Sequence, residues 1–214
     1  PLSLWQADQR YDDRRLFVID DPTVTGKAYF EIGLYRMRQD DIARINIIDG
    51  NGNVAGNQVT FGASWIGAPP PPHALASFRP LHVHFAEQVE LVGWRWLPPA
   101  ADSDQLQVAL WWRALDRMPT AYTSFVHLLD PAQTIVAQGD QPPGGVENPT
   151  SLWAPGEEVT THYQLAVPAD VKLAELVLRI GLYEPVSTHQ LPVTDSGTLP
   201  AVPENQTYIL LPLE

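Results

Sequence analysis

The sequence has no cysteine and only two methionines, and its 13 Lys and Arg residues are outnumbered by 25 Asp and Glu residues. The absence of cysteine excludes a disulfide framework, thiol catalysis and Cys-type zinc sites. The net charge of −12 argues against binding to nucleic acid or to an anionic membrane surface, because an acidic protein repels phosphate groups. No apolar run approaches the roughly 18 residues that a membrane-spanning helix needs.

The residues that are abundant favour short strands over helices. The chain has 21 Pro, 14 Gly and seven Trp residues. Pro and Gly concentrate in turns, whereas Trp and β-branched residues suit strands. Apolar and polar side chains alternate with the period of a strand that buries one face, and the expected strands span 81–86, 89–97, 105–113, 122–130, 134–138, 159–167, 176–182 and 205–213. We therefore expect an all-β fold, an antiparallel two-layer β-sandwich of the immunoglobulin-like or jelly-roll kind.

Several stretches of the sequence occur twice at one separation. Pro149–Trp153 (PTSLW) matches Pro1–Trp5 (PLSLW), and Ile180–Tyr183 (IGLY) matches Ile32–Tyr35, each 148 positions earlier. The same shift aligns two further matches, Asn57-Gln58 with Asn205-Gln206 and Val54 with Val202. Matches that share one offset predict a duplicated structural unit.

The repeat predicts one complete unit and half of an earlier one. We expect a partial β-sandwich over residues 1–67, a Pro-rich linker over 68–73, and a complete β-sandwich over 74–214. Four or five strands cannot cover both sides of their own core, so another sheet must complete the half unit. Upstream polypeptide, the second domain or a partner chain could supply it. The chain begins at Pro1 without an initiator Met, so we expect it to be a piece of a longer protein. We expect extensive packing against the second domain, or a homodimer through the half unit.

Several motifs together carry a resemblance to a known family. They are Phe125–Asp130 (FVHLLD), Ala137–Asp140 (AQGD), Pro149–Trp153 with Pro155–Glu157, and Gly181–Tyr183. The chain resembles the C-terminal extracytoplasmic β-sandwich region of bacterial (Chloroflexi-type) membrane proteins, many of them family 39-type glycosyltransferases. Residues 186–191 (VSTHQL) depart from the family's Gly-Arg hairpin. The resemblance implies a location and an architecture. It carries over no catalytic residue, since the transferase chemistry lies in membrane loops that this chain lacks.

Three residues could begin a metal site. His82 and His84 share a strand face with Glu87 close behind, as cupin-type sites begin. The spacing to the carboxylate is one residue short, no glycine precedes the pair, and a second half-motif is missing. The alternative is two solvated histidines on an edge strand.

Other polar motifs favour structural interpretations. Asp49–Asn53 (DGNGN) starts like a calcium loop but lacks its later ligands, so a hairpin turn is expected. His127 reads as a buried, hydrogen-bonded histidine. We expect the adjacent acids Glu157 and Glu158 to lie in a solvated turn rather than to form the carboxylate pair of a glycosidase.

The tryptophans allow two interpretations. Trp94 and Trp96 share one strand face, and Trp111 lies on the next expected strand. An exposed indole can stack on a sugar ring, so these three are candidate glycan contacts. The recurrence of Trp5 and Trp153 in both units favours a packing role instead.

Three functions remain open on the sequence. The leading hypothesis is a non-catalytic accessory module on the extracytoplasmic face of the membrane, with the upstream membrane domain of the same protein as its partner. The second is a carbohydrate-binding β-sandwich that uses Trp94, Trp96 or Trp111. The third is a cupin-like metalloenzyme. We expect no cofactor and no nucleic-acid partner.

Overall fold

The computed structural model describes residues 6, 9–10, 12, 14–21, 23–38, 41–67, 77–99, 103–167 and 171–213. The fold is all-β, as expected, with 49% of residues in strands and several antiparallel sheets. None of the helices within these residues is long and apolar enough to cross a membrane. The expected Pro-rich linker at 68–73 and the PLSLW motif at 1–5 lie outside the described residues.

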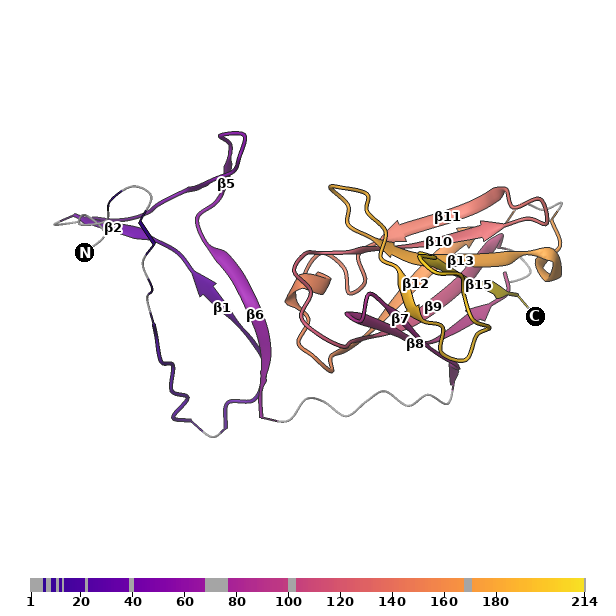
Figure 1. Ribbon diagram of the computed structural model, residues 1–214, viewed down its shortest axis with the longest axis horizontal. Helices are drawn as coiled ribbons and strands as arrows, with labels where there is room; N and C mark the ends of the chain where they lie inside the picture. Colours follow the sequence, from indigo (N-terminus) through magenta and orange to yellow (C-terminus); the bar gives the residue numbers. More distant parts are fainter. Residues whose placement is uncertain are drawn as a thin grey trace.

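Nine strands after residue 78 form two antiparallel sheets (Figure 1). The five-stranded sheet has the order β12-β9-β8-β7-β14, and the four-stranded sheet has the order β11-β10-β13-β15. Strand bounds of the first sheet are β7 Arg79–Phe85, β8 Val89–Leu97, β9 Gln105–Ala114, β12 Glu158–Ala166 and β14 Val193–Asp195. Those of the second are β10 Thr123–Leu129, β11 Ile135–Gln141, β13 Val177–Tyr183 and β15 Tyr208–Pro212.

One apolar core fills the space between these two sheets. Each strand contributes alternate residues, so that Leu106, Val108, Leu110 and Trp112 of β9 all face inward, as the period of two requires. On β10 the inward residues include Val126 and Leu128. The alternation in the sequence therefore identified the core correctly, and the β-sandwich architecture follows from it. The choice between an immunoglobulin-like and a jelly-roll topology stays open.

The turns form where the sequence predicts them. Asp130 Oδ1 accepts a hydrogen bond from the backbone N–H of Thr134 at 2.8 Å, and Gln133 has a φ of 64°, which closes the tight connection between β10 and β11. The DGNGN motif connects β4 (Ile47–Ile48) to β5 (Val54–Gly56). Within that hairpin Asp49 Oδ1 accepts hydrogen bonds from two backbone N–H groups. The hairpin interpretation of this motif is confirmed.

The N-terminal part contains three two-stranded ribbons rather than a packed pair of sheets. β1 (Gly26–Ile32) pairs with β6 (Val59–Ile66), β2 (Tyr35–Arg38) pairs with β3 (Asp41–Arg44), and β4 pairs with β5. We call the described residues from Leu16 to Ile66 the half unit. In Figure 1 the half unit stands beside the sandwich, with β6 on the side nearest to it.

The repeat is visible in the strand pairing. A shift of 148 residues maps β13 onto the segment 29–35, which overlaps β1, and maps β15 onto 60–64, which lies within β6. Both pairs are antiparallel. The register of the two pairs differs by two residues. The shift of 148 predicts that Phe30 lies opposite Ala63, but Phe30 lies opposite Phe61, after an irregularity between Ala28 and Phe30. The two pairs of strands thus occupy corresponding positions in the two units.

Candidate functional site

The structure places the two candidate metal-binding histidines with different carboxylates. His82 Nδ1 lies 2.7 Å from Glu90 Oε1, whereas His84 Nδ1 lies 3.6 Å from Glu87 Oε2. His82 sits in a bulge of β7, where the register shifts between Pro80 and Val83, and its φ is 58°. Within the described residues no group of three His, Cys, Asp or Glu side chains is arranged to hold a metal ion.

The tryptophans proposed as glycan contacts are mostly interior. Trp94 is 3% exposed and belongs to the core between the sheets, and Trp96 is partly buried against the same core. Trp111 is 1% exposed and lies outside that core, in edge contact with the Phe78 ring at 5.7 Å. Neither Trp94 nor Trp111 has an open face on which a sugar could stack, so packing is the role of these two.

Glu157 and Glu158, the two adjacent acids after the PTSLW motif, both accept hydrogen bonds from other parts of the sandwich. The interpretation of this pair as a solvated turn is therefore wrong. Glu157 is buried, and its Oε2 accepts a hydrogen bond from the backbone N–H of Ala154 at 2.8 Å. Glu158 accepts hydrogen bonds from the Arg113 guanidinium at 2.8 and 3.0 Å. Sequence alone did not show this, because Arg113 lies 45 residues away and meets Glu158 only through the pairing of β9 with β12.

Glu157 also joins the half unit to the sandwich. Lys27 Nζ of β1 lies 3.0 Å from Glu157 Oε1 and donates a hydrogen bond to Asn148 Oδ1 at 2.6 Å. Asn148 in turn donates to Glu157 Oε1 and accepts from the Trp153 indole N–H through its backbone oxygen. The PTSLW loop, which contains the 3-10 turn η3 (Thr150–Leu152), is therefore where the half unit contacts the sandwich. No feature of the sequence pointed to Lys27.

The FVHLLD, AQGD and GLY motifs meet on the outer face of the four-stranded sheet. The Phe125 ring lies between those of His127 and Tyr183, with centroids 4.9 and 6.4 Å away. Gly181 lies beneath it, since a Cβ there would come within 2.4 Å of Phe125 Cζ. The Tyr183 hydroxyl donates a hydrogen bond to Asp140 at 3.2 Å. The FVHLLD, AQGD and GLY motifs thus hold one another in place.

His127 is the titratable centre of this cluster. Its Nδ1 lies 2.9 Å from Arg179 Nη2, and its Nε2 lies 3.5 Å from Asp140 Oδ1. A guanidinium only donates, so Nδ1 accepts and the proton of the neutral ring is on Nε2. Burial lowers the pKa of His127, Asp140 opposes that shift, and Arg179 adds to it. The hydrogen bond expected of His127 is present, whereas the ring is partly rather than fully buried and faces away from the core.

The largest unexplained surface belongs to the half unit. Among the described residues, 17 of the 22 exposed large apolar side chains lie between Leu16 and Phe61. Monomeric soluble proteins rarely expose apolar surface on this scale. The apolar side chains of this region that are exposed are Leu16, Phe17, Val18, Ile19, Val24, Tyr29, Phe30, Ile32, Leu34, Tyr35, Met37, Ile42, Ile45, Ile48, Val54, Val59 and Phe61.

The repeat explains why these side chains are apolar. By the shift of 148, Ile32 corresponds to Ile180, which is fully buried in the sandwich core, whereas Ile32 is 56% exposed. The same holds for three other pairs, Phe30 with Leu178, Leu34 with Leu182, and Phe61 with Ile209. We call Phe30, Ile32, Leu34 and Phe61 the uncovered face. It has the composition of a sandwich core but no second sheet over it in the described structure.

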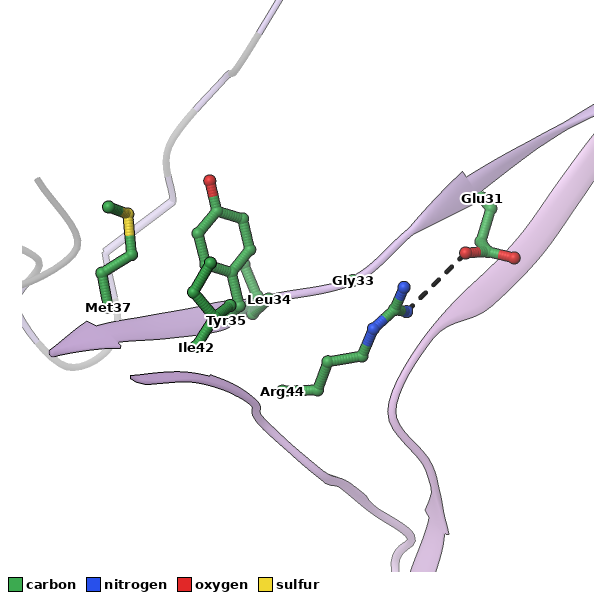
Figure 2. Close-up of a pocket in the computed structure, with 7 residues that line it drawn as sticks. All are labelled: Glu31, Gly33, Leu34, Tyr35, Met37, Ile42 and Arg44. Carbon is green, nitrogen blue, oxygen red and sulfur yellow. Dashed lines mark ion pairs between the residues drawn. The ribbon is translucent and has the colours of Figure 1, made fainter. Parts of the chain in front are cut away.

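Cavities surround the end of this face. One of about 580 Å³ is shown in Figure 2 and is lined by Glu31, Gly33, Leu34, Tyr35, Met37, Ile42 and Arg44. Its only ion pair drawn joins Arg44 Nη1 to Glu31 Oε1 at 3.7 Å. A second of about 560 Å³ includes all four residues of the uncovered face in its lining. No described residue of the sandwich lines either space. Extensive packing against the second domain, or a homodimer through the half unit, stays a prediction.

The half unit and the sandwich present different kinds of surface. The half unit offers apolar side chains and strand edges, and it contacts the sandwich through Lys27 and through β6, which lies against η3. The motif residues of the sandwich mainly pack against and bond to one another. In comparisons with known proteins, no family model, no curated protein and no solved structure matches this chain.

Proposed function

We propose that this chain is a non-catalytic, extracytoplasmic accessory module of a larger membrane-anchored bacterial protein, such as a glycosyltransferase, and that its half unit docks against a β-sheet from another polypeptide segment. The observation that carries the docking role is the uncovered face: positions that form the core in the complete unit are apolar but exposed in the half unit. The membrane location and the transferase connection rest on the resemblance of the FVHLLD, PTSLW and GLY motifs.

Physical chemistry supports docking over a free half unit. Burying an apolar side chain of this size contributes about 1.5–3 kcal/mol relative to leaving it exposed. The four residues of the uncovered face would together contribute several kcal/mol on covering, which is the scale of a stable association after its entropic cost. An isolated ribbon of two strands is at best marginally stable in water. A covering sheet would therefore stabilise the half unit as well as bind it.

Hydrogen exchange tests the docking role. We expect backbone amides of β1 and β6 to exchange rapidly in the isolated 214-residue chain and to be protected in the complete protein, whereas those of β9 are protected in both. The β9 amides are the internal control, because that strand is central in a covered sheet. Equally rapid exchange of β1 and β6 in the complete protein would contradict the proposal.

Thiol labelling tests the location. The segment has no cysteine, so a single Val186→Cys substitution at a position that is 91% exposed introduces one reactive site. We expect a membrane-impermeant maleimide to label this variant in intact cells and to leave the unsubstituted protein at background. Labelling only after cell lysis would place the module in the cytoplasm and contradict the proposal.

A further inference from the structure

The strands that correspond in the two units differ in their neighbours. In the sandwich, β13 lies between β10 and β15 and pairs with both. In the half unit, β1 pairs with β6, which corresponds to β15, and no described strand takes the position of β10. An unpaired strand edge is a template for another strand, because its N–H and C=O groups can form a new ladder. The half unit therefore lacks a neighbour on a particular edge of β1.

The space that this neighbour would occupy borders a cavity, although a Cβ built on Gly33 would lie 3.0 Å from Asn57 O and 3.5 Å from Arg44 Nη1. In the sandwich, Phe125 of β10 pairs with Gly181 of β13, and its ring lies over that glycine. The corresponding glycine is Gly33, and it lines the cavity of Figure 2. Two other lining residues, Glu31 and Tyr35, correspond to Arg179 and Tyr183, which flank Phe125 on the same outer face. The repeat thus places an aromatic ring beside this cavity, where the half-exposed Arg44 side chain would have to move aside.

We infer that the free edge of β1 binds one added antiparallel β-strand of the β10 type, with an aromatic side chain over Gly33 and apolar side chains on the uncovered face. This inference rests on the proposed docking function and names its partner. The strand comes from a first-half repeat segment outside residues 1–214. The chain's own β10 is not free for this role, because it already pairs with β11 and β13, and the same is true in a second copy.

The repeat also fixes the expected register and one charge preference. Shifted by 148, the β10–β13 pairs place the Phe125-type residue opposite Gly33, the Val126-type residue opposite Ile32, and the His127-type residue opposite position 31. Position 31 is Glu, where the sandwich has Arg179. A basic residue on the added strand at the position of His127 would therefore be favoured, because it faces a carboxylate instead of a guanidinium.

A synthetic peptide of residues 120–131, which contains the β10 sequence, is the probe. We expect it to bind the intact chain, to protect the amides of 29–35 against hydrogen exchange, and to bind at least about tenfold more weakly as the Phe125→Ala peptide, since the ring fills the space over Gly33. The protein variant Ile32→Asp should abolish binding. Val186→Asp, an equally drastic change at an exposed apolar position of the sandwich, should leave binding unchanged.

Three outcomes would overturn the inference. Binding that survives Ile32→Asp would place the peptide on a different edge. Failure of the peptide to bind, together with a dimer that Ile32→Asp dissociates in sedimentation analysis, would assign the face to a second copy and leave the docking function standing. Failure of the peptide, with β1 and β6 exchanging rapidly in the complete protein, would overturn both the added strand and the docking function.

Discussion

Ile180 and Ile32 provide a matched pair in which one substitution tests the central claim. They occupy corresponding positions of the repeat, yet Ile180 is fully buried and Ile32 is 56% exposed. Ile→Ala at a buried position costs about 2–5 kcal/mol, from lost transfer free energy and the cavity left behind. Less than half of the Ile32 side chain is covered. The transfer loss there is about 1 kcal/mol, because the three carbon groups that are removed contribute about 0.8 kcal/mol each only when fully buried, and there is no closed cavity to add.

Urea unfolding measures this difference in the sandwich. The core tryptophans Trp94, Trp112 and Trp153 provide a fluorescence signal for it. With a urea m-value of about 2 kcal/mol/M, we expect Ile180→Ala to lower the unfolding midpoint by about 1–2.5 M. Ile32→Ala should leave that midpoint unchanged in the isolated chain. In the complete protein, the same Ile32→Ala change should weaken docking of the half unit.

Two results would refute the reasoning. A loss of sandwich stability from Ile32→Ala comparable to that from Ile180→Ala would show that Ile32 already belongs to a shared core. Tolerance of Ile180→Ala at under about 0.5 kcal/mol, the usual range of surface substitutions, would show that the sandwich core is not packed as described. A second buried site, Leu178→Ala, checks that the result is general, because Leu178 is also fully buried.

Three further predictions concern other parts of the molecule. Gly181→Ala should lower the melting temperature by the equivalent of about 1–3 kcal/mol, because its Cβ would meet Phe125 Cζ at 2.4 Å and Thr207 O at 2.6 Å; an unchanged melting temperature would contradict that contact. Lys27→Met removes the contacts with Glu157 and Asn148, so small-angle scattering should show a larger radius of gyration; an unchanged radius would contradict a role for Lys27 in holding the half unit against the sandwich. Burial lowers the pKa of His127, so the unfolded chain binds this proton more tightly, and the free energy of unfolding should fall as pH drops below the ordinary pKa of 6.5. The difference between the urea midpoints at pH 7.5 and pH 5.5 should be smaller in His127→Gln than in the unsubstituted protein. An equal difference in the two proteins would refute the assignment.

The sequence was most informative where local pattern and burial agree. Alternation along 105–113 placed β9 within one residue and put Trp112 on the core face and Trp111 on the opposite face, as observed. The turn at Asp130–Gln133 and the DGNGN hairpin were also identified, because positive φ and Asx hydrogen bonding are local properties of Gly, Asn and Asp. Such features depend on neighbours in sequence, so they are visible without coordinates.

The candidate sites were less predictable, because exposure is decided by the opposite sheet and by loops. A tryptophan on the outer face of a strand looks available for a ligand, yet Trp111 is covered by Phe78. Glu157 looks like a turn residue, yet it is bound by Lys27, which is 130 residues away. Neither Phe78 nor Lys27 carries a sequence signal for these contacts.

The sequence by itself determined that the chain is built from antiparallel strands, and it predicts that one unit is represented twice, since side-chain periodicity and a shared offset are properties of the chain alone. Only the tertiary structure decided that the uncovered face is exposed among the described residues and that the open edge of β1 lies beside a cavity at Gly33. The physical reason is that periodicity indicates which side chains lie on the apolar face of a strand, whereas tertiary packing determines whether another sheet covers that face.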